Sequence, residues 1–172
     1  FLDADDVWHP EKLASVQQLI SDHPDADVIY HDESEISATG VRRELRRFQI
    51  RRPVYENLLF ATMGANPLSP SAVVVRRSLL VALGGFSVAP AFSGTEDIDL
   101  WLRLAKQQVT FVHLPTVLGA YRRSASAMTA RIDEHAENQW NVFEHHYRTN
   151  VPTLSMPQRV KRRLRARRRA AN

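Results

Sequence analysis

The chain has 172 residues, of which 44% are hydrophobic, and a formal net charge of +4. This length fits one domain with or without a tail, and the apolar content argues against wholesale disorder. The absence of cysteine excludes disulfides, cysteine-ligated metals and a thiol nucleophile from these 172 residues. No stretch of the sequence approaches the ~20 consecutive apolar residues that a membrane-spanning helix needs.

The positive charge is concentrated at the C-terminal end. Residues 151–172 hold eight of the 23 basic residues and no acidic residue, which leaves fifteen basic and nineteen acidic residues in 1–150. The basic character therefore belongs to residues 151–172, and it gives no information about what residues 1–150 bind. We expect a globular unit over 1–150 followed by a basic helical tail over 151–172. Because the chain opens on Phe1 within a motif, we also expect it to be part of a longer protein.

Hydrophobic periodicity predicts the elements of the first half. A buried strand should end at Phe1-Leu2, and Pro10 should open a helix with apolar residues at Leu13, Val16, Leu19 and Ile20. The apolar run 28–30 predicts a short strand. Residues 32–53 are polar and arginine-rich, which predicts a loop or weak strands.

The second half alternates strands and helices more regularly. The patterns predict a strand over 71–75, a helix over 78–83 capped by Gly84, a helix after Thr95, strands over 109–112 and 117–121, and a long helix over 132–147. Alternation of this kind is typical of the α/β class.

The first candidate site is the acidic run Asp3-Ala4-Asp5-Asp6. Side chains alternate along a strand, so Asp3 and Asp5 at a strand end would share one face. Two such carboxylates repel unless a cation lies between them or one is protonated, and hard oxygen ligands suit Mg²⁺ or Mn²⁺. Such a cation binds substrate phosphates, so a diphosphate is a natural ligand. The alternative is that these acids only favour the N-terminus of the next helix.

The second candidate site is Thr95-Glu96-Asp97-Ile98-Asp99, which places acids in the first turn of a predicted helix. Acids there complement the helix dipole and need no chemistry. The functional interpretation is that Asp97 stays ionised at neutral pH and serves as a general base for a bound hydroxyl. The local sequence leaves both interpretations open.

Four segments in this order resemble the motifs of the family 2 glycosyltransferases of the GT-A fold. They are FLDADDVWHPEKL, similar to the Asp-x-Asp motif; RRSLLVALGGF; GTEDIDLWLRL, similar to the Glu-Asp motif; and GAYRRSASAMT, similar to the Tyr-Arg motif. The resemblance covers residues 1 to about 130. It implies a GT-A-type α/β fold with a mixed sheet flanked by helices, incomplete at its N-terminus because the nucleotide-binding half would precede Phe1.

The resemblance also implies roles for matching residues. Asp3 and Asp5 would hold a nucleotide-diphospho-sugar through Mg²⁺ or Mn²⁺, and Asp97 would remove the proton of the acceptor hydroxyl. The implied substrate-binding residues are Glu96, Trp101, Arg122 and Asn66. One departure is Ser124 after Arg123, where the family often has a histidine near the diphosphate.

The implied reaction is an inverting transfer to a hydroxyl of a glycan or lipid-linked glycan, as in cell-surface polysaccharide biosynthesis. The implied location is cytoplasmic, at the inner face of the membrane. The resemblance further implies that residues 1–172 alone are inactive, since the nucleotide pocket would lie upstream.

Parts of the sequence also fit two other function classes. Asp3-Ala4-Asp5-Asp6-Val7 also fits the motif of haloacid dehalogenase-like phosphatases, with Asp3 as nucleophile and Asp5 as acid/base. That family needs a lysine between the nucleophile and a later acidic motif, which Glu96-Asp97 could imitate. Lys12 comes too early for this role, and Lys106 and Lys161 come after the motif, which argues against this class. The third class is a non-enzymatic module that binds an anionic membrane surface through residues 156–172. The tail lacks aromatic residues, so nucleic acid is not expected, and a solvated terminus is the alternative.

Overall fold

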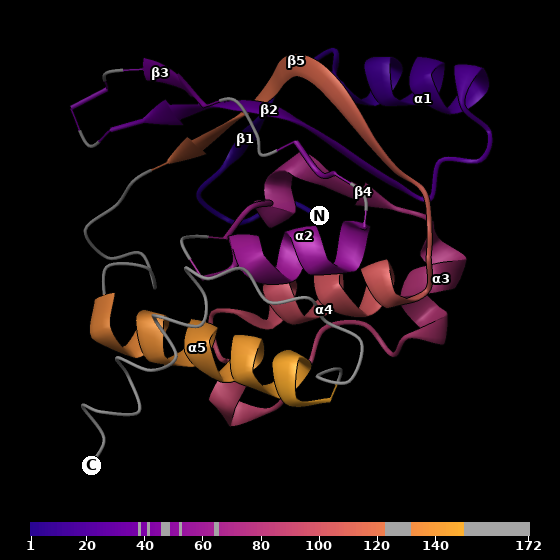
Figure 1. Ribbon diagram of the computed structural model, residues 1–172. Coiled ribbons are helices and arrows are strands. Elements are labelled where there is room, and N and C mark those ends of the chain that lie inside the picture. Colours follow the sequence, from indigo (N-terminus) through magenta and orange to yellow (C-terminus); the bar gives the residue numbers. More distant parts are fainter. Residues whose placement is uncertain are drawn as a thin grey trace.

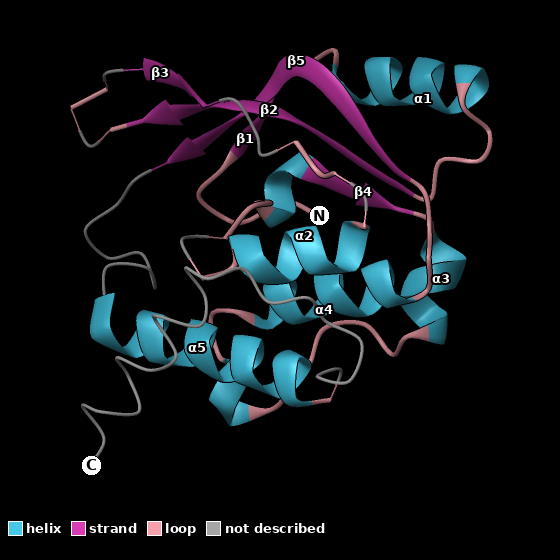
Figure 2. Cartoon of the chain, viewed as in Figure 1, coloured by secondary structure: helices cyan, strands magenta, loops and turns pink. Residues whose placement is uncertain are grey.

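The computed structural model describes residues 1–37, 39–40, 42–45, 49–51, 53–63, 66–122 and 132–149. These residues form one mixed sheet with helices on both faces (Figures 1 and 2). The α/β class and the mixed sheet flanked by helices are therefore confirmed. The predicted tail over 151–172, and Arg123 and Ser124, lie outside the described residues.

The sheet is built around two long parallel strands. β2 (Val28–Ile36) runs parallel to β5 (Phe111–Arg122). β1 (Val7–Trp8) pairs antiparallel with β5, and β3 (Arg42–Leu45) and β4 (Val73–Val75) pair antiparallel with β2. The order across the sheet is β1-β5-β2-β3, with β4 also on β2.

Helices cover the two faces unequally, as Figure 1 shows. α1 (Lys12–Asp22) packs on one face over the small cluster of Val16, Ala26 and Ile29. The other face carries the larger core with α2 (Val54–Ala61), α4 (Glu96–Lys106) and α5 (Ile132–Arg148). The shorter helices are α3 (Arg77–Ala82), η1 (Pro70–Ala72) and η2 (Pro90–Phe92).

α4 is the central element of the larger core. The apolar face that the sequence predicted for it, Ile98, Trp101, Leu102 and Ala105, is buried as expected. Thr95 is its N-cap residue, but the Thr95 hydroxyl donates to the Phe92 carbonyl instead of capping the helix. The helix therefore starts where the sequence indicated, with its first acidic residues at the edge of the core.

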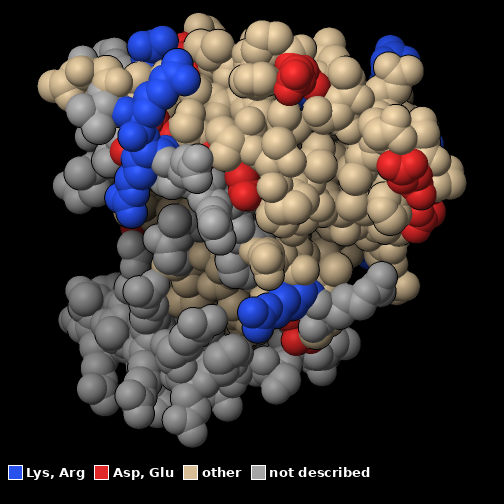
Figure 3. Space-filling model, turned by 90° about the horizontal axis from the view of Figure 1, so that it is seen from above, with Lys and Arg blue, Asp and Glu red and all other residues tan. Residues whose placement is uncertain are grey.

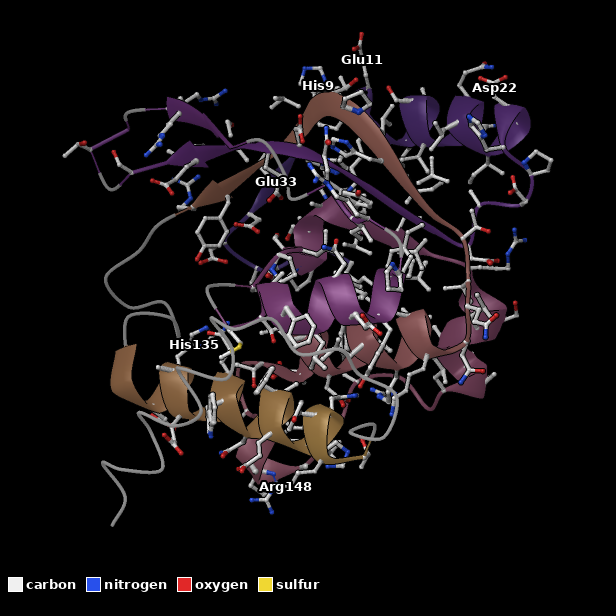
Figure 4. All side chains as sticks on the ribbon, viewed as in Figure 1. His9, Glu11, Asp22, Glu33, His135 and Arg148 are labelled. Carbon is white, nitrogen blue, oxygen red and sulfur yellow. The ribbon has the colours of Figure 1, made fainter. Side chains whose placement is uncertain are left out.

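β2 is longer than the sequence predicted. The strand continues beyond Tyr30 through the polar residues 31–34, which are buried, and the expected loop begins only after Ile36. Neighbouring strands on both sides supply the backbone partners of this stretch, and Asp32 Oδ1 lies 2.9 Å from His113 Nε2. Figure 4 shows Glu33 inside the molecule on β2, while His9 and Glu11 lie at the surface.

Three further predictions were wrong or incomplete. Phe1-Leu2 is not a strand end, because the chain turns at once: Asp6 N donates to Asp3 O at 3.1 Å. α1 buries Val16 but leaves Leu13 64% exposed, since only one side of the helix faces the sheet. α2 was not predicted, because its eight residues span only two turns and show little periodicity.

Candidate functional site

The fold brings the two predicted acidic clusters together. The ring of Phe1 packs 5.9 Å from the ring of Trp101 on α4, centroid to centroid. Burial raises the pKa of Asp3, and the negative charges of Asp6, Asp5 and Glu96 raise it further. Glu96 is thus close enough to act on Asp3 through its charge, which places the start of α4 near the N-terminal turn.

Ser71 anchors the N-terminal turn. The Asp3 backbone N–H donates to Ser71 Oγ at 3.0 Å. The Ser71 carbonyl accepts hydrogen bonds from Trp8 Nε1 at 3.1 Å and from the buried Lys12 Nζ at 2.6 Å. Sequence reasoning missed this role of Ser71, because no local signal links it to a motif 68 residues away.

The end of β5 lies against the same turn. The Arg122 backbone N–H donates to Asp6 Oδ1 at 3.0 Å, and Arg122 Nε donates to the Asp5 carbonyl at 3.2 Å. The pairing of Val7 with Ala120 sets this position. The guanidinium group of Arg122 therefore lies beside Asp5, one of the two predicted metal ligands, and its contact with a diphosphate stays a prediction.

Positive charge extends across this end of the sheet. Arg122 and Arg42 are both register partners of Ile36, so they lie in one row, and both are exposed. Figure 3 shows basic side chains gathered at this end of the upper face, while acidic side chains are scattered. Such a surface favours an anionic ligand.

Two buried carboxylate oxygens in this region lack a hydrogen-bond partner within the described part of the chain. They are Asp6 Oδ2 and Glu96 Oε2, and Asp6 is only 8% exposed. Asp6 is the third acidic residue of the run that the sequence singled out, but its position in that run did not predict that it would be buried. Each free oxygen can accept a hydrogen bond or a cation.

The donor set at the turn fits Mg²⁺ or Mn²⁺. Asp3 and Asp5 present exposed carboxylates, which are hard oxygen ligands. Among the residues that the structure describes, no group of three or more His, Asp or Glu side chains is arranged to hold a metal ion. A cation here would take one or two carboxylates from the protein and the rest of its ligands from water and substrate phosphates.

Asp97 is enclosed at the start of α4. Its side chain is 8% exposed. Asn66 Nδ2 donates to Asp97 Oδ2 at 2.5 Å, and the Ile98 backbone N–H donates to Asp97 Oδ1 at 2.8 Å. Both oxygens of the carboxyl group are therefore held from different directions.

Burial, with a smaller contribution from the nearby charge of Glu96, raises the pKa of Asp97 to about 7, although the hydrogen bonds from Ile98 and Asn66 lower it. This corrects the expectation that Asp97 stays ionised at neutral pH. Burial outweighs the donors that favour the charged form, so the group is divided between its two forms near pH 7. A pKa near neutrality suits a group that takes up and releases a proton.

Two predicted substrate-binding residues have structural contacts. Asn66 was expected to touch the sugar, and in the structure its amide contacts Asp97. Trp101 is 1% exposed, and its indole N–H donates to the Leu68 carbonyl at 3.1 Å. The structure thus gives Trp101 a packing role, and a role in substrate binding stays a prediction.

No helix in the described part of the chain is long and apolar enough to cross a membrane.

The sequence profile of a family described as "Glycosyltransferase like family 2" matches residues 1–166.

Three relatives are similar to this chain in sequence. "Uncharacterized protein y4gI" of Sinorhizobium fredii is 31% identical over 75% of this chain and 13% of its own length. Two proteins of Haemophilus influenzae are each named "Uncharacterized glycosyltransferase". One is 23% identical over 89% of this chain and 55% of its own length, and the other is 28% identical over 62% of this chain and 35% of its own length. The chain thus spans about half, or less, of each relative's length.

Proposed function

Since the chain belongs to the glycosyltransferase like family 2, we propose that it carries the acceptor and diphosphate side of an inverting sugar-transfer site. The donor is a nucleotide-diphospho-sugar, and the acceptor is a hydroxyl of a glycan or lipid-linked glycan. The observation that supports this most is the convergence of the N-terminal carboxylates, Arg122 and the buried Asp97 on one region.

Asp97 acts as the general base in this proposal. In its deprotonated form it accepts the proton of the acceptor hydroxyl, and the acceptor oxygen attacks the anomeric carbon. The bond from that carbon to the nucleoside diphosphate breaks on the opposite side, so the anomeric centre inverts. Glu96, whose carboxyl group has a buried free oxygen, binds the acceptor beside Asp97.

The diphosphate leaves at the N-terminal turn. Arg122 supplies a positive charge there, and Asp3 and Asp5 would hold Mg²⁺ or Mn²⁺. A bound ion of this kind would neutralise charge on the leaving diphosphate. Contact of residues 156–172 with an anionic membrane, and the accompanying cytoplasmic location, stay predictions.

The phosphatase alternative receives no support from the geometry. Lys12 is the lysine nearest to the Asp3 turn in sequence, and its Nζ donates to the Ser71 carbonyl. A phosphatase of that class would need the ammonium group at the phosphate, beside Asp3. The family profile favours transfer over phosphate hydrolysis.

Substitution of Asp97 tests the base. The assay follows nucleoside diphosphate release from UDP-, GDP- and dTDP-sugars with Mn²⁺ and candidate acceptors, using the whole protein that contains this chain. Asp97→Asn should lower transfer by about 10²–10⁴-fold, because the general base is lost. Wild-type transfer should rise as the pH passes through about 7, where Asp97 loses its proton.

Two companion variants sharpen this test. Asp5→Ala should weaken Mn²⁺-dependent binding of UDP, GDP or dTDP, whereas Asp97→Asn should leave that binding intact. Asp22→Asn is the matched control, because Asp22 is an exposed carboxylate that contacts Gln18 far from the site. Near-normal turnover by Asp97→Asn would overturn the assignment of the base.

A further inference from the structure

The segment 66–71 contacts both acidic clusters, and its first residue reaches the proposed base. From its contacts we propose that Asn66 is a positioning residue, which holds the Asp97 carboxylate in the orientation that receives the acceptor proton. The proposal rests on the proposed function of Asp97, and it replaces the expected sugar contact of Asn66 with a contact to the protein's own base.

The orientation of the Asn66 amide is fixed by a second contact. Asn66 Oδ1 accepts the Leu68 backbone N–H at 3.1 Å, so the oxygen points into its own segment. The amide nitrogen is then left to face Asp97 Oδ2, 2.5 Å away. Since an NH₂ group can only donate, Asn66 presents Asp97 with a donor that favours the carboxylate form.

The Asp97 carboxyl group is held at both oxygens. Ile98 N–H binds Oδ1 from within α4, and Asn66 binds Oδ2 from outside the helix. With Asp97 only 8% exposed, little water competes for these bonds. The rotation of the carboxyl group is therefore set by the protein before any acceptor arrives, which is what preorganised proton transfer requires.

The segment that carries Asn66 is itself fixed to both clusters. The Leu68 carbonyl accepts the indole N–H of Trp101 on α4, and Ser71 Oγ accepts the Asp3 backbone N–H. Between them, Ser69 Oγ donates to Glu33 on β2 at 3.4 Å. Asn66 thus acts from a segment bound to α4, to the sheet and to the N-terminal turn.

Other charged groups near the start of α4 are engaged elsewhere or act through charge alone. Glu96 raises the pKa of Asp97 from the same helix, and its charge also raises the pKa of Asp3 in the N-terminal turn. His146 from α5 and Arg103 from α4 bind Asp99. Within the described residues, Asn66 is the side chain that hydrogen-bonds Asp97.

Two substitutions at Asn66 test the proposal through the titration of Asp97. The readout is the ¹³C carboxyl NMR shift of Asp97 against pH in the folded chain, with Asp97→Asn used to assign the signal. Asn66→Ala removes the donor and should move the midpoint upward by about one pH unit. Asn66→Asp keeps the shape but replaces the donor with a second carboxylate, so its upward shift should be larger.

Ser71→Ala is the matched control. It removes a hydrogen bond made by the same segment to the other acidic cluster, so the Asp97 midpoint should not move. Circular dichroism and thermal unfolding confirm that each variant is folded. If Asn66→Ala loses its fold, Asn66→Asp still tests the proposal, because its side chain has nearly the same volume.

The outcomes separate the two proposals. Unmoved midpoints in folded Asn66→Ala and Asn66→Asp would overturn the positioning role, whatever the transfer activity. Shifted midpoints together with an equal displacement of the pH–rate profile would support both proposals. Shifted midpoints with transfer that does not depend on Asp97 would retain the Asn66 contact and overturn the proposed base.

Discussion

At the scale of single residues, the sequence names candidate side chains, whereas their pKa values and contacts depend on the folded structure. Asp97 could be named as a candidate from its motif, but its raised pKa could not be predicted, because burial is the largest cause of the shift and outweighs the effects of its sequence neighbours. Asn66 was recognisable only as a candidate without a partner. Its contact with Asp97 joins residues 31 positions apart.

The raised pKa of Asp97 has a consequence for stability. The ordinary value of 3.8 applies to the unfolded chain, and the folded value is about 7. Between these values the folded chain binds a proton that the unfolded chain has lost. The contribution of Asp97 to stability therefore falls as the pH rises from about 4 to 7, and above 7 the full cost of its buried carboxylate is present.

Asp97→Asn should remove this dependence. The free energy of unfolding of the variant, minus that of wild type, should be larger at pH 8 than at pH 5 by on the order of 2.5 kcal/mol. Urea denaturation of the 172-residue chain at both pH values measures the difference. A gain of equal size at pH 5 and pH 8 would contradict a titration effect and indicate a change in packing.

At the scale of elements, α4 combines site and scaffold. Its first turn carries Glu96 and Asp97, and its next turns fill the core. Asp99 connects it to α5, since Asp99 Oδ1 lies 2.8 Å from His146 Nε2, while Oδ2 accepts Arg103 Nε at 2.7 Å. Arg103 also donates to the carbonyls of residues 83 and 85, after α3.

Removal of Asp99 should loosen these contacts. Burial raises its pKa, but the hydrogen bond from His146 and the charge of Arg103 prevail, so the pKa lies below the ordinary value and the group is charged at neutral pH. Asp99→Ala leaves Arg103 without this partner and should cost about 3–5 kcal/mol of stability.

Urea denaturation at pH 7 measures that loss, with Glu144→Ala as the control. Glu144 pairs with Arg148 one turn along α5, in a largely exposed ion pair, so its removal should cost less than about 1 kcal/mol. A comparable loss of unfolding free energy in the two variants would show that the buried Asp99 contacts stabilise the chain no more than an exposed ion pair does.

The elements themselves were predictable to different degrees. α4 and α5 have long apolar stripes, so periodicity located them, and Gly84 ends α3 with a positive φ of 75° as its capping role requires. β2 beyond Tyr30 was missed, because a strand with neighbours on both sides can bury polar residues when partners satisfy them. The polarity of these residues therefore could not distinguish a buried strand from an exposed loop.

At the scale of the whole molecule, an aromatic cluster joins the N-terminal turn to the helical layer. The Phe1 and Phe86 ring centroids lie 5.0 Å apart, and both rings pack on Trp101. Figure 1 shows the N-terminus between the sheet and these helices. The two acidic clusters therefore keep their relative position through the core.

Trp101→Leu tests this connection. The variant loses ring contacts and leaves the buried Leu68 carbonyl without its indole donor, so the free energy of unfolding should fall by about 3 kcal/mol. Urea denaturation provides the measurement, with Val88→Ala as the control, since Val88 is 97% exposed and should change stability by less than about 0.5 kcal/mol. A loss below about 1 kcal/mol for Trp101→Leu would contradict the packing role.

The sequence by itself determined the α/β class and the main helices, and it named the acidic, arginine and asparagine residues as candidates for the site, because periodicity and motifs can be read from the order of residues along the chain. Tertiary structure alone decided that the Asp3 turn is held by Ser71, that Asn66 contacts Asp97, and that Asp97 has a pKa near 7. Those features depend on contacts between distant segments and on exclusion of water, and neither is encoded in the spacing of neighbouring residues.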